Sequence, residues 1–83
     1  MVPRPKTVVP LDNFMLQIEF VNGEKRLYDM KKNLSRPAYK NLNSIAIFNT
    51  VKVQDITLEW VTGEDICPDD IYNNSILISN FEP

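Results

Sequence analysis

The clearest alternation of apolar and polar positions in the chain is at Leu16, Ile18 and Phe20, which are separated by single polar residues. A period of two is typical of a strand that buries one face. The dipeptide Asn22-Gly23 follows this segment, and it favours the two positive φ angles of a type I′ turn. We therefore predict a β-hairpin at this point in the chain.

A second set of alternating positions lies later in the sequence. Val51 and Val53 alternate with polar residues, and Ile56, Leu58 and Trp60 do the same. These positions predict two strands joined by a tight turn. Trp60 is expected in the core, because an indole buries a large apolar area. A role as a binding hot spot is the alternative if the ring is exposed.

The positions of the prolines predict two short helices and an edge strand. Pro37 and Pro68 suit the first turn of a helix, and a short helix is predicted to begin at each. Pro10 ends the β-branched segment 7–10, and proline cannot donate to a sheet ladder, so this segment is predicted as an edge strand. The apolar segment 75–81 is predicted either as a terminal strand or as a surface that docks on a partner.

These elements together predict one small α+β domain. The expected architecture is a small antiparallel β-meander, made of two hairpins plus an edge strand, with one or two short helices. A chain of 83 residues is long enough for one core and too short for two, so residues 1–83 are assigned to a single domain. The docking of its apolar tail, residues 75–83, is left open.

Composition excludes several classes of protein. The 43% hydrophobic and 24% charged residues are typical of a globular protein. The chain has one cysteine, whereas small secreted domains usually carry several disulfides. It also lacks an apolar run of about 20 residues and the apolar stretch of a secretory signal. A cytoplasmic location without a membrane partner is therefore expected.

Catalytic chemistry finds little support in the sequence. The absence of histidine removes the commonest general base and the commonest zinc ligand. Cys67 lies among acidic residues, whose negative charge disfavours the thiolate that a nucleophile requires. The two glycines are too few to build a loop that cradles phosphate. We therefore expect no enzyme and no cofactor.

An acidic segment is the candidate for a metal site. Its members are Glu64, Asp65, Asp69 and Asp70. Carboxylates bind Ca²⁺ and Mg²⁺, but the ligand spacing of an EF-hand loop is absent. The preferred interpretation is that Asp65 caps the second short helix, while Asp69 and Asp70 favour its N-terminus. No metal is predicted, and a ligand of this segment stays the alternative.

Two surfaces are candidates for recognition. The first would bind a protein through the edge strand and the apolar tail, and its residues are Val8, Val9, Tyr72, Ile76, Ile78 and Phe81. The second would bind nucleic acid, and its residues are Lys25, Arg26, Lys31, Lys32 and Arg36. The net charge of −2 disfavours direct binding of nucleic acid.

Several landmarks occur in an order that hydrophobic patterning alone rarely produces. The most distinctive are Trp60, Gly63, Asp65, Pro68, Asp69 and Tyr72. With the first hairpin, they make residues 5–73 resemble the bacterial domain-of-unknown-function family 2442. The resemblance implies a small α+β fold in a compact bacterial or mobile-element protein that is often encoded beside another small protein. It supplies no catalytic residues.

The predicted function is a small non-catalytic protein–protein interaction module. The resemblance gives this module the form of an antitoxin-like or mobile-element regulator that occludes a partner protein, such as a nuclease. Two alternatives stay open: a nucleic-acid-associated regulator that uses Lys25 to Arg36, and a structural domain with no autonomous activity. An exposed edge strand suits self-association and a foreign partner equally well.

Overall fold

The strands of the protein form two antiparallel sheets in the computed structural model, which describes residues 2–79. One sheet has four strands in the order β1-β2-β3-β7, and the other has three in the order β4-β5-β6. The strands are β1 (Pro5–Leu11), β2 (Met15–Phe20), β3 (Lys25–Asp29), β4 (Lys52–Gln54), β5 (Thr57–Glu59), β6 (Asp65–Ile66) and β7 (Ile76–Ser79). The predicted α+β class is confirmed.

Short helical segments connect the strands. They are the α-helices α1 (Ile45–Phe48) and α2 (Pro68–Asn73) and the 3-10 helices η1 (Asp12–Phe14), η2 (Met30–Asn33) and η3 (Pro37–Asn43). A proline begins η3 and another begins α2, as predicted. The predicted cap at Asp65 is wrong, because Asp65 belongs to β6 and Cys67 precedes α2 without a side-chain cap. None of the helices in residues 2–79 has the length and apolar character to cross a membrane.

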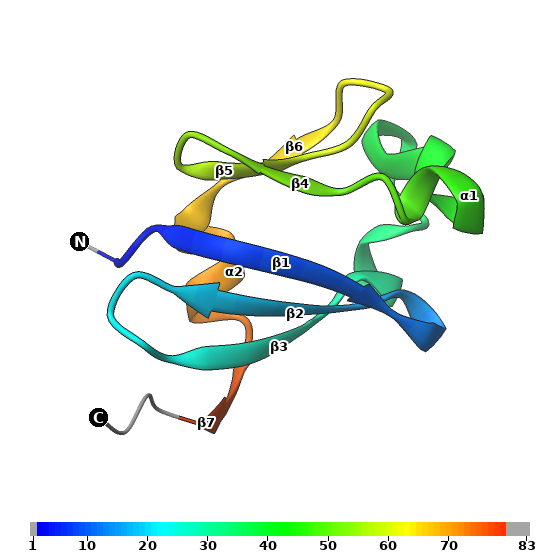
Figure 1. Cartoon of the computed structure of the whole chain (residues 1–83). Helices are drawn as coiled ribbons and strands as arrows, with labels where there is room; N and C mark the ends of the chain where they lie inside the picture. The colour runs from blue at the N-terminus through cyan, green and yellow to red at the C-terminus, as the bar shows by residue number, and fades with distance from the viewer. Residues whose placement is uncertain (1, 80–83) are drawn as a thin grey trace.

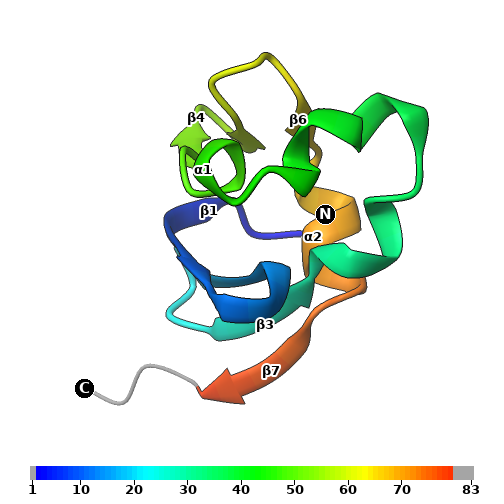
Figure 2. The ribbon, with the colours of Figure 1, turned by 90° about the vertical axis from the view of Figure 1, so that its right-hand side faces the viewer.

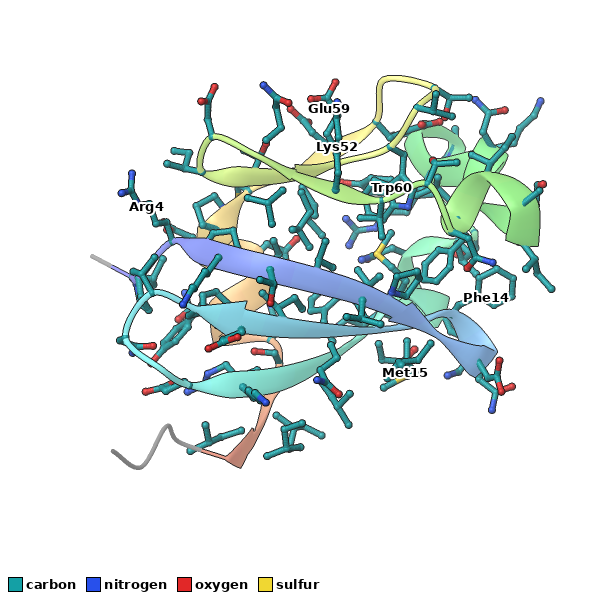
Figure 3. The ribbon with its side chains drawn as sticks, viewed as in Figure 1. Arg4, Phe14, Met15, Lys52, Glu59 and Trp60 are labelled. Carbon is teal, nitrogen blue, oxygen red and sulfur yellow. The ribbon has the colours of Figure 1, made fainter. Side chains whose placement is uncertain are left out.

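The four-stranded sheet has one covered face. Figure 1 shows β4, β5 and β6 above β1, with α2 behind the four-stranded sheet. The turned view in Figure 2 places α2 on one side of this sheet, and no described element lies on its other side. Figure 3 shows Trp60 pointing into the space between the two sheets. The core therefore lies between the sheets and α2.

The core contains the inward positions that alternation predicts for β2. Leu16, Ile18 and Phe20 are fully buried, and Trp60 is 1% exposed. The indole Nε1 donates a hydrogen bond to the carbonyl of Phe48 at 2.9 Å. The other buried apolar residues are Tyr28, Met30, Leu42, Phe48, Val51, Leu58, Ile66 and Ile71. The core role of Trp60 is thus confirmed.

The alternation wrongly predicts one apolar position of the second hairpin as inward-facing. Ile56 is exposed, because it lies in the turn between β4 and β5 beside Asp55, whose φ is 55°. Strand β5 begins one residue later, at Thr57. The hairpin itself forms as predicted, with Val53 opposite Leu58.

Both edges of the four-stranded sheet come from segments for which the sequence predicts a strand. The segment 7–10 lies within β1, which is one edge. The apolar tail supplies β7, the other edge, which pairs antiparallel with β3. The part of the predicted tail beyond residue 79 lies outside the described residues.

The turn between β2 and β3 differs from the predicted type I′ turn. Gly23 has a φ of 90°, whereas Asn22 is not among the residues with positive φ. The Gly23 N–H donates to the Phe20 carbonyl at 2.9 Å, and the Phe20 N–H donates to the Glu24 carbonyl at 2.8 Å. This is a three-residue loop in which a type I turn precedes a left-handed glycine. The type I′ prediction is wrong, because only one left-handed residue is needed in the longer loop.

The same turn joins β5 to β6. The Gly63 N–H donates to the Trp60 carbonyl at 2.9 Å, and the Trp60 N–H donates to the Glu64 carbonyl at 2.9 Å. Residues 19–24 and 59–64 share the order Glu, aromatic, Val, polar, Gly, Glu. The protein therefore uses one turn chemistry in both sheets, with a buried aromatic residue before each turn.

Replacing Gly63 with alanine is expected to lower the free energy of unfolding by about 1–2 kcal/mol. Gly63 has a φ of 98°, and an added Cβ would meet no atom within 4 Å, so the cost is one of backbone conformation alone. Urea denaturation measures it. Gly63→Asn should lose less, because asparagine adopts left-handed conformations more readily. Equal losses for the two variants would contradict this explanation.

Candidate interaction surface

The face of the four-stranded sheet that points away from α2 is called the outer face below. Residues paired across antiparallel strands project from the same face. One row of paired residues crosses all four strands and consists of Val9, Gln17, Leu27 and Ile76. Leu11 and Met15 pair beside this row. Figure 3 shows Met15 pointing away from Trp60 and the second sheet.

The outer face carries exposed apolar side chains. Val9 is 48% exposed, Leu11 is 37% exposed and Ile76 is 70% exposed. Charged residues lie beside them, since Glu19 pairs with Lys25 in the next row. An apolar patch with a polar rim is the usual mark of a protein interaction surface. No described element of the protein covers it.

The β7 strand adds an open edge to the outer face. It has a partner strand on one side only, β3. Its residues Leu77 and Ile78 are 44% and 45% exposed. The other edge, β1, differs because it contains Pro5 and Pro10 and lies against β4 and β5. The four-stranded sheet is therefore most open to strand pairing at β7.

The structure brings together only part of the predicted protein-binding residues. Val9 and Ile76 lie in one row of the outer face, and Ile78 lies on the edge strand next to them. Val8 instead packs against the core, because neighbouring residues of a strand project from opposite faces. Phe81 lies outside the described residues.

Tyr72 packs against neighbouring side chains of the same molecule and is not part of the outer face. Its ring makes a T-shaped contact with Phe20 at 5.2 Å between centroids, and the Arg26 guanidinium lies 4.0 Å from the centre of the Tyr72 ring. The hydroxyl of Tyr72 donates to Glu24 Oε2 at 3.1 Å, and Arg26 Nε donates to Glu24 Oε1 at 2.8 Å. The hydrogen bond from Arg26 is the main cause that lowers the pKa of Glu24. This cluster ties β3 to α2.

Two of the predicted nucleic-acid residues, Lys25 and Arg26, do not lie on one surface. Arg26 is engaged by Glu24, and the Lys31 ammonium lies 3.1 Å from the Asp29 carboxylate. Lys25 projects from the outer face, whereas Arg26 projects from the opposite one. A nucleic-acid interface requires basic side chains gathered on one face. The split between Lys25 and Arg26 disfavours a single interface that contains both residues.

The acidic segment holds no metal-binding arrangement among the described residues. No group of three or more His, Cys, Asp or Glu side chains lies close enough there to hold an ion. Asp69 and Asp70 lie in the first turn of α2, as predicted. Glu64 accepts a hydrogen bond from Asn41 Nδ2 at 3.0 Å. Cys67 is an exposed free thiol.

Comparison with known proteins places the chain in a family. A family model described as "Protein of unknown function (DUF2442)" matches residues 5–76. The chain belongs to this family. The resemblance predicted from the landmark residues is confirmed, and the match reaches the first residue of β7. No curated protein and no solved structure matches the chain.

A buried polar network in this DUF2442 member was not predicted from the sequence. Tyr28 is fully buried, and its hydroxyl accepts a hydrogen bond from Asn33 Nδ2 at 2.8 Å. The same hydroxyl donates to Asp70 Oδ1 at 3.2 Å. Burial raises the pKa of Tyr28 to about 12. The network joins β3, η2 and α2. No sequence motif predicts it, because Asp70 lies 42 residues after Tyr28 in the chain.

A strained corner adjoins the outer face of this DUF2442 member. Asn13 and Phe14 have φ angles of 62° and 57°, which are rare for residues with side chains. Beside them lies a hollow of about 390 Å³, whose lining includes the exposed residues Leu11 and Ile45. Phe14 is anchored there by an edge contact with Phe48 at 5.2 Å. The apolar surface therefore continues from the outer face towards α1.

Proposed function

We propose that this protein is a small non-catalytic protein–protein interaction module that docks through its outer face and occludes a partner protein. The observation that supports this most is the uncovered row that crosses the four-stranded sheet, in which Val9, Leu27 and Ile76 are apolar and Gln17 is the one polar member. A small protein that exposes a contiguous apolar patch usually buries it against a partner.

The proposed action needs no reacting group. Burial of apolar side chains supplies affinity, at about 25 cal/mol for each Å² removed from water. Glu19 and Lys25 at the margin of the patch would orient the partner through charge pairing. The net charge of −2 would speed association with a basic surface, such as the substrate groove of a nuclease. This is the antitoxin-like or regulatory form of the proposal.

Affinity capture from lysate of the producing organism tests the proposal. The tagged chain should retain a stoichiometric protein, and Val9→Lys should reduce retention by about tenfold or more, which corresponds to about 1.4 kcal/mol. Lysine is well tolerated on exposed edge strands, so the variant should fold. Val61→Lys is the matched control, because Val61 is an exposed valine in the turn between β5 and β6.

The two lysine variants separate a specific surface from general stickiness. Retention by the wild type and Val61→Lys, with loss by Val9→Lys, supports the outer face as the docking surface. Equal retention by both variants, or no retained protein at all, contradicts the proposal.

A further inference from the structure

We infer that the edge of β7 pairs with β7 of a second copy of the chain. The two strands would run antiparallel about a two-fold axis at Leu77, so that the two four-stranded sheets join into one continuous sheet. The inference deepens the proposed interaction role, on which it rests. It states that the docking surface is assembled from two copies.

The sequence around β7 is a palindrome. Residues 74–80 read Asn-Ser-Ile-Leu-Ile-Ser-Asn in both directions. In an antiparallel pair with two-fold symmetry each residue faces its mirror position. Leu77 would therefore face Leu77 of the second copy, and Ile76 would face Ile78 of the second copy. At each of these central positions an aliphatic residue would face an aliphatic residue. The palindrome gives this pairing whenever the second strand is another copy of β7.

The β7 edge also lacks charged residues and prolines, which usually prevent an edge strand from pairing with another strand. Natural edge strands are commonly blunted by charged residues or prolines. Residues 74–80 contain neither, whereas β1 carries Lys6 and two prolines. The pairing of β3 with β7 has one register shift, opposite Lys25 and Arg26. This shift bends the strand, but no described strand lies on its outer side.

Pairing would also extend the outer face. Ile76 is 70% exposed and faces Leu27 within one copy. Across the β7–β7 junction, the row that ends at Ile76 in one copy would continue into the corresponding row of the second copy. The rows of the two copies would then lie in one sheet, and the exposed aliphatic side chains of β7 would be partly buried at the junction.

Sedimentation velocity with charge-swapped strands tests the inference. The wild type should sediment with twice the monomer mass of 9.6 kDa at high protein concentration. The variants Ile76→Lys/Ile78→Lys and Ile76→Glu/Ile78→Glu should each be monomeric, because like charges would face each other across the axis. Their equimolar mixture should recover the doubled mass, since opposite charges then face each other. Val61→Lys, in the turn between β5 and β6, should leave the wild-type mass unchanged.

Each outcome decides the inference. A wild type that stays at 9.6 kDa at every concentration overturns it, and so does a mixture that stays monomeric. A monomer that still retains a partner through Val9 overturns self-pairing and leaves the proposed function intact. A dimer that retains its partner equally well with Val9→Lys supports self-pairing and contradicts the proposed docking through the outer face. Circular dichroism confirms that each variant is folded.

Discussion

Replacing Trp60 with alanine is expected to remove about 3–5 kcal/mol from the free energy of unfolding. Domains of this size have a stability of roughly 5 kcal/mol, so little folded protein should remain. The indole is 1% exposed, fills the space between the two sheets and holds the Phe48 carbonyl through Nε1. Circular dichroism and urea denaturation measure the loss.

Trp60→Phe is the matched control for this prediction. Phenylalanine keeps most of the buried apolar area but leaves the Phe48 carbonyl without its donor, at a cost of about 1–3 kcal/mol. The variant should therefore fold with reduced stability. A Trp60→Ala protein with the urea midpoint of the wild type would show that the two sheets do not share this core.

Replacing Tyr28 with phenylalanine is expected to cost about 1–3 kcal/mol, although only one oxygen is removed. The buried side chain of Asn33 loses the acceptor that lies 2.8 Å from its amide nitrogen, and Asp70 loses a donor. Replacing both partners of a buried hydrogen bond costs less than replacing one. Tyr28→Phe/Asn33→Leu should therefore recover part of the loss. A double variant less stable than both single variants would contradict the network.

The same residue predicts a dependence on alkaline pH. The pKa of Tyr28 is raised from 10.0 to about 12 by burial, so the folded state keeps a proton that the unfolded state loses. The stabilising contribution is complete below pH 10 and is lost as the pH rises through about 12. The free energy of unfolding should fall across this window, and Tyr28→Phe should reduce the slope. An unchanged slope in the variant would contradict the assignment to Tyr28.

Local alternation predicts the inward face of a strand well but not the positions where strands end. Leu16, Ile18 and Phe20 are all buried, because a regular strand repeats every two residues. Ile56 continues an alternation of the same kind and is exposed, since the chain has already entered a turn there. The dipeptide Asn22-Gly23 announces a turn, whereas its type depends on a loop length that only the pairing of β2 with β3 determines.

The outer face depends on strand order, which the sequence does not display. Val9, Leu27 and Ile76 come from three strands, and only the observed register places them in one row. Val9 and Ile76 are predicted from the sequence because they lie in an expected edge strand and in the apolar tail. Leu27 belongs to neither segment and is not predicted. Val8 is also predicted from the edge strand, but the alternation of β1 turns it towards the core.

Oxidation of Met15 tests most directly whether the outer face is the docking surface. Met15 lies on this face, whereas Met30 is fully buried and serves as the internal reference. Peroxide converts accessible methionine to the sulfoxide, which mass spectrometry quantifies. In the free chain Met15 should be oxidised and Met30 spared, and in the complex retained from lysate the oxidation of Met15 should slow several-fold. Equal oxidation of Met15 in the free and bound chain would contradict docking through the outer face.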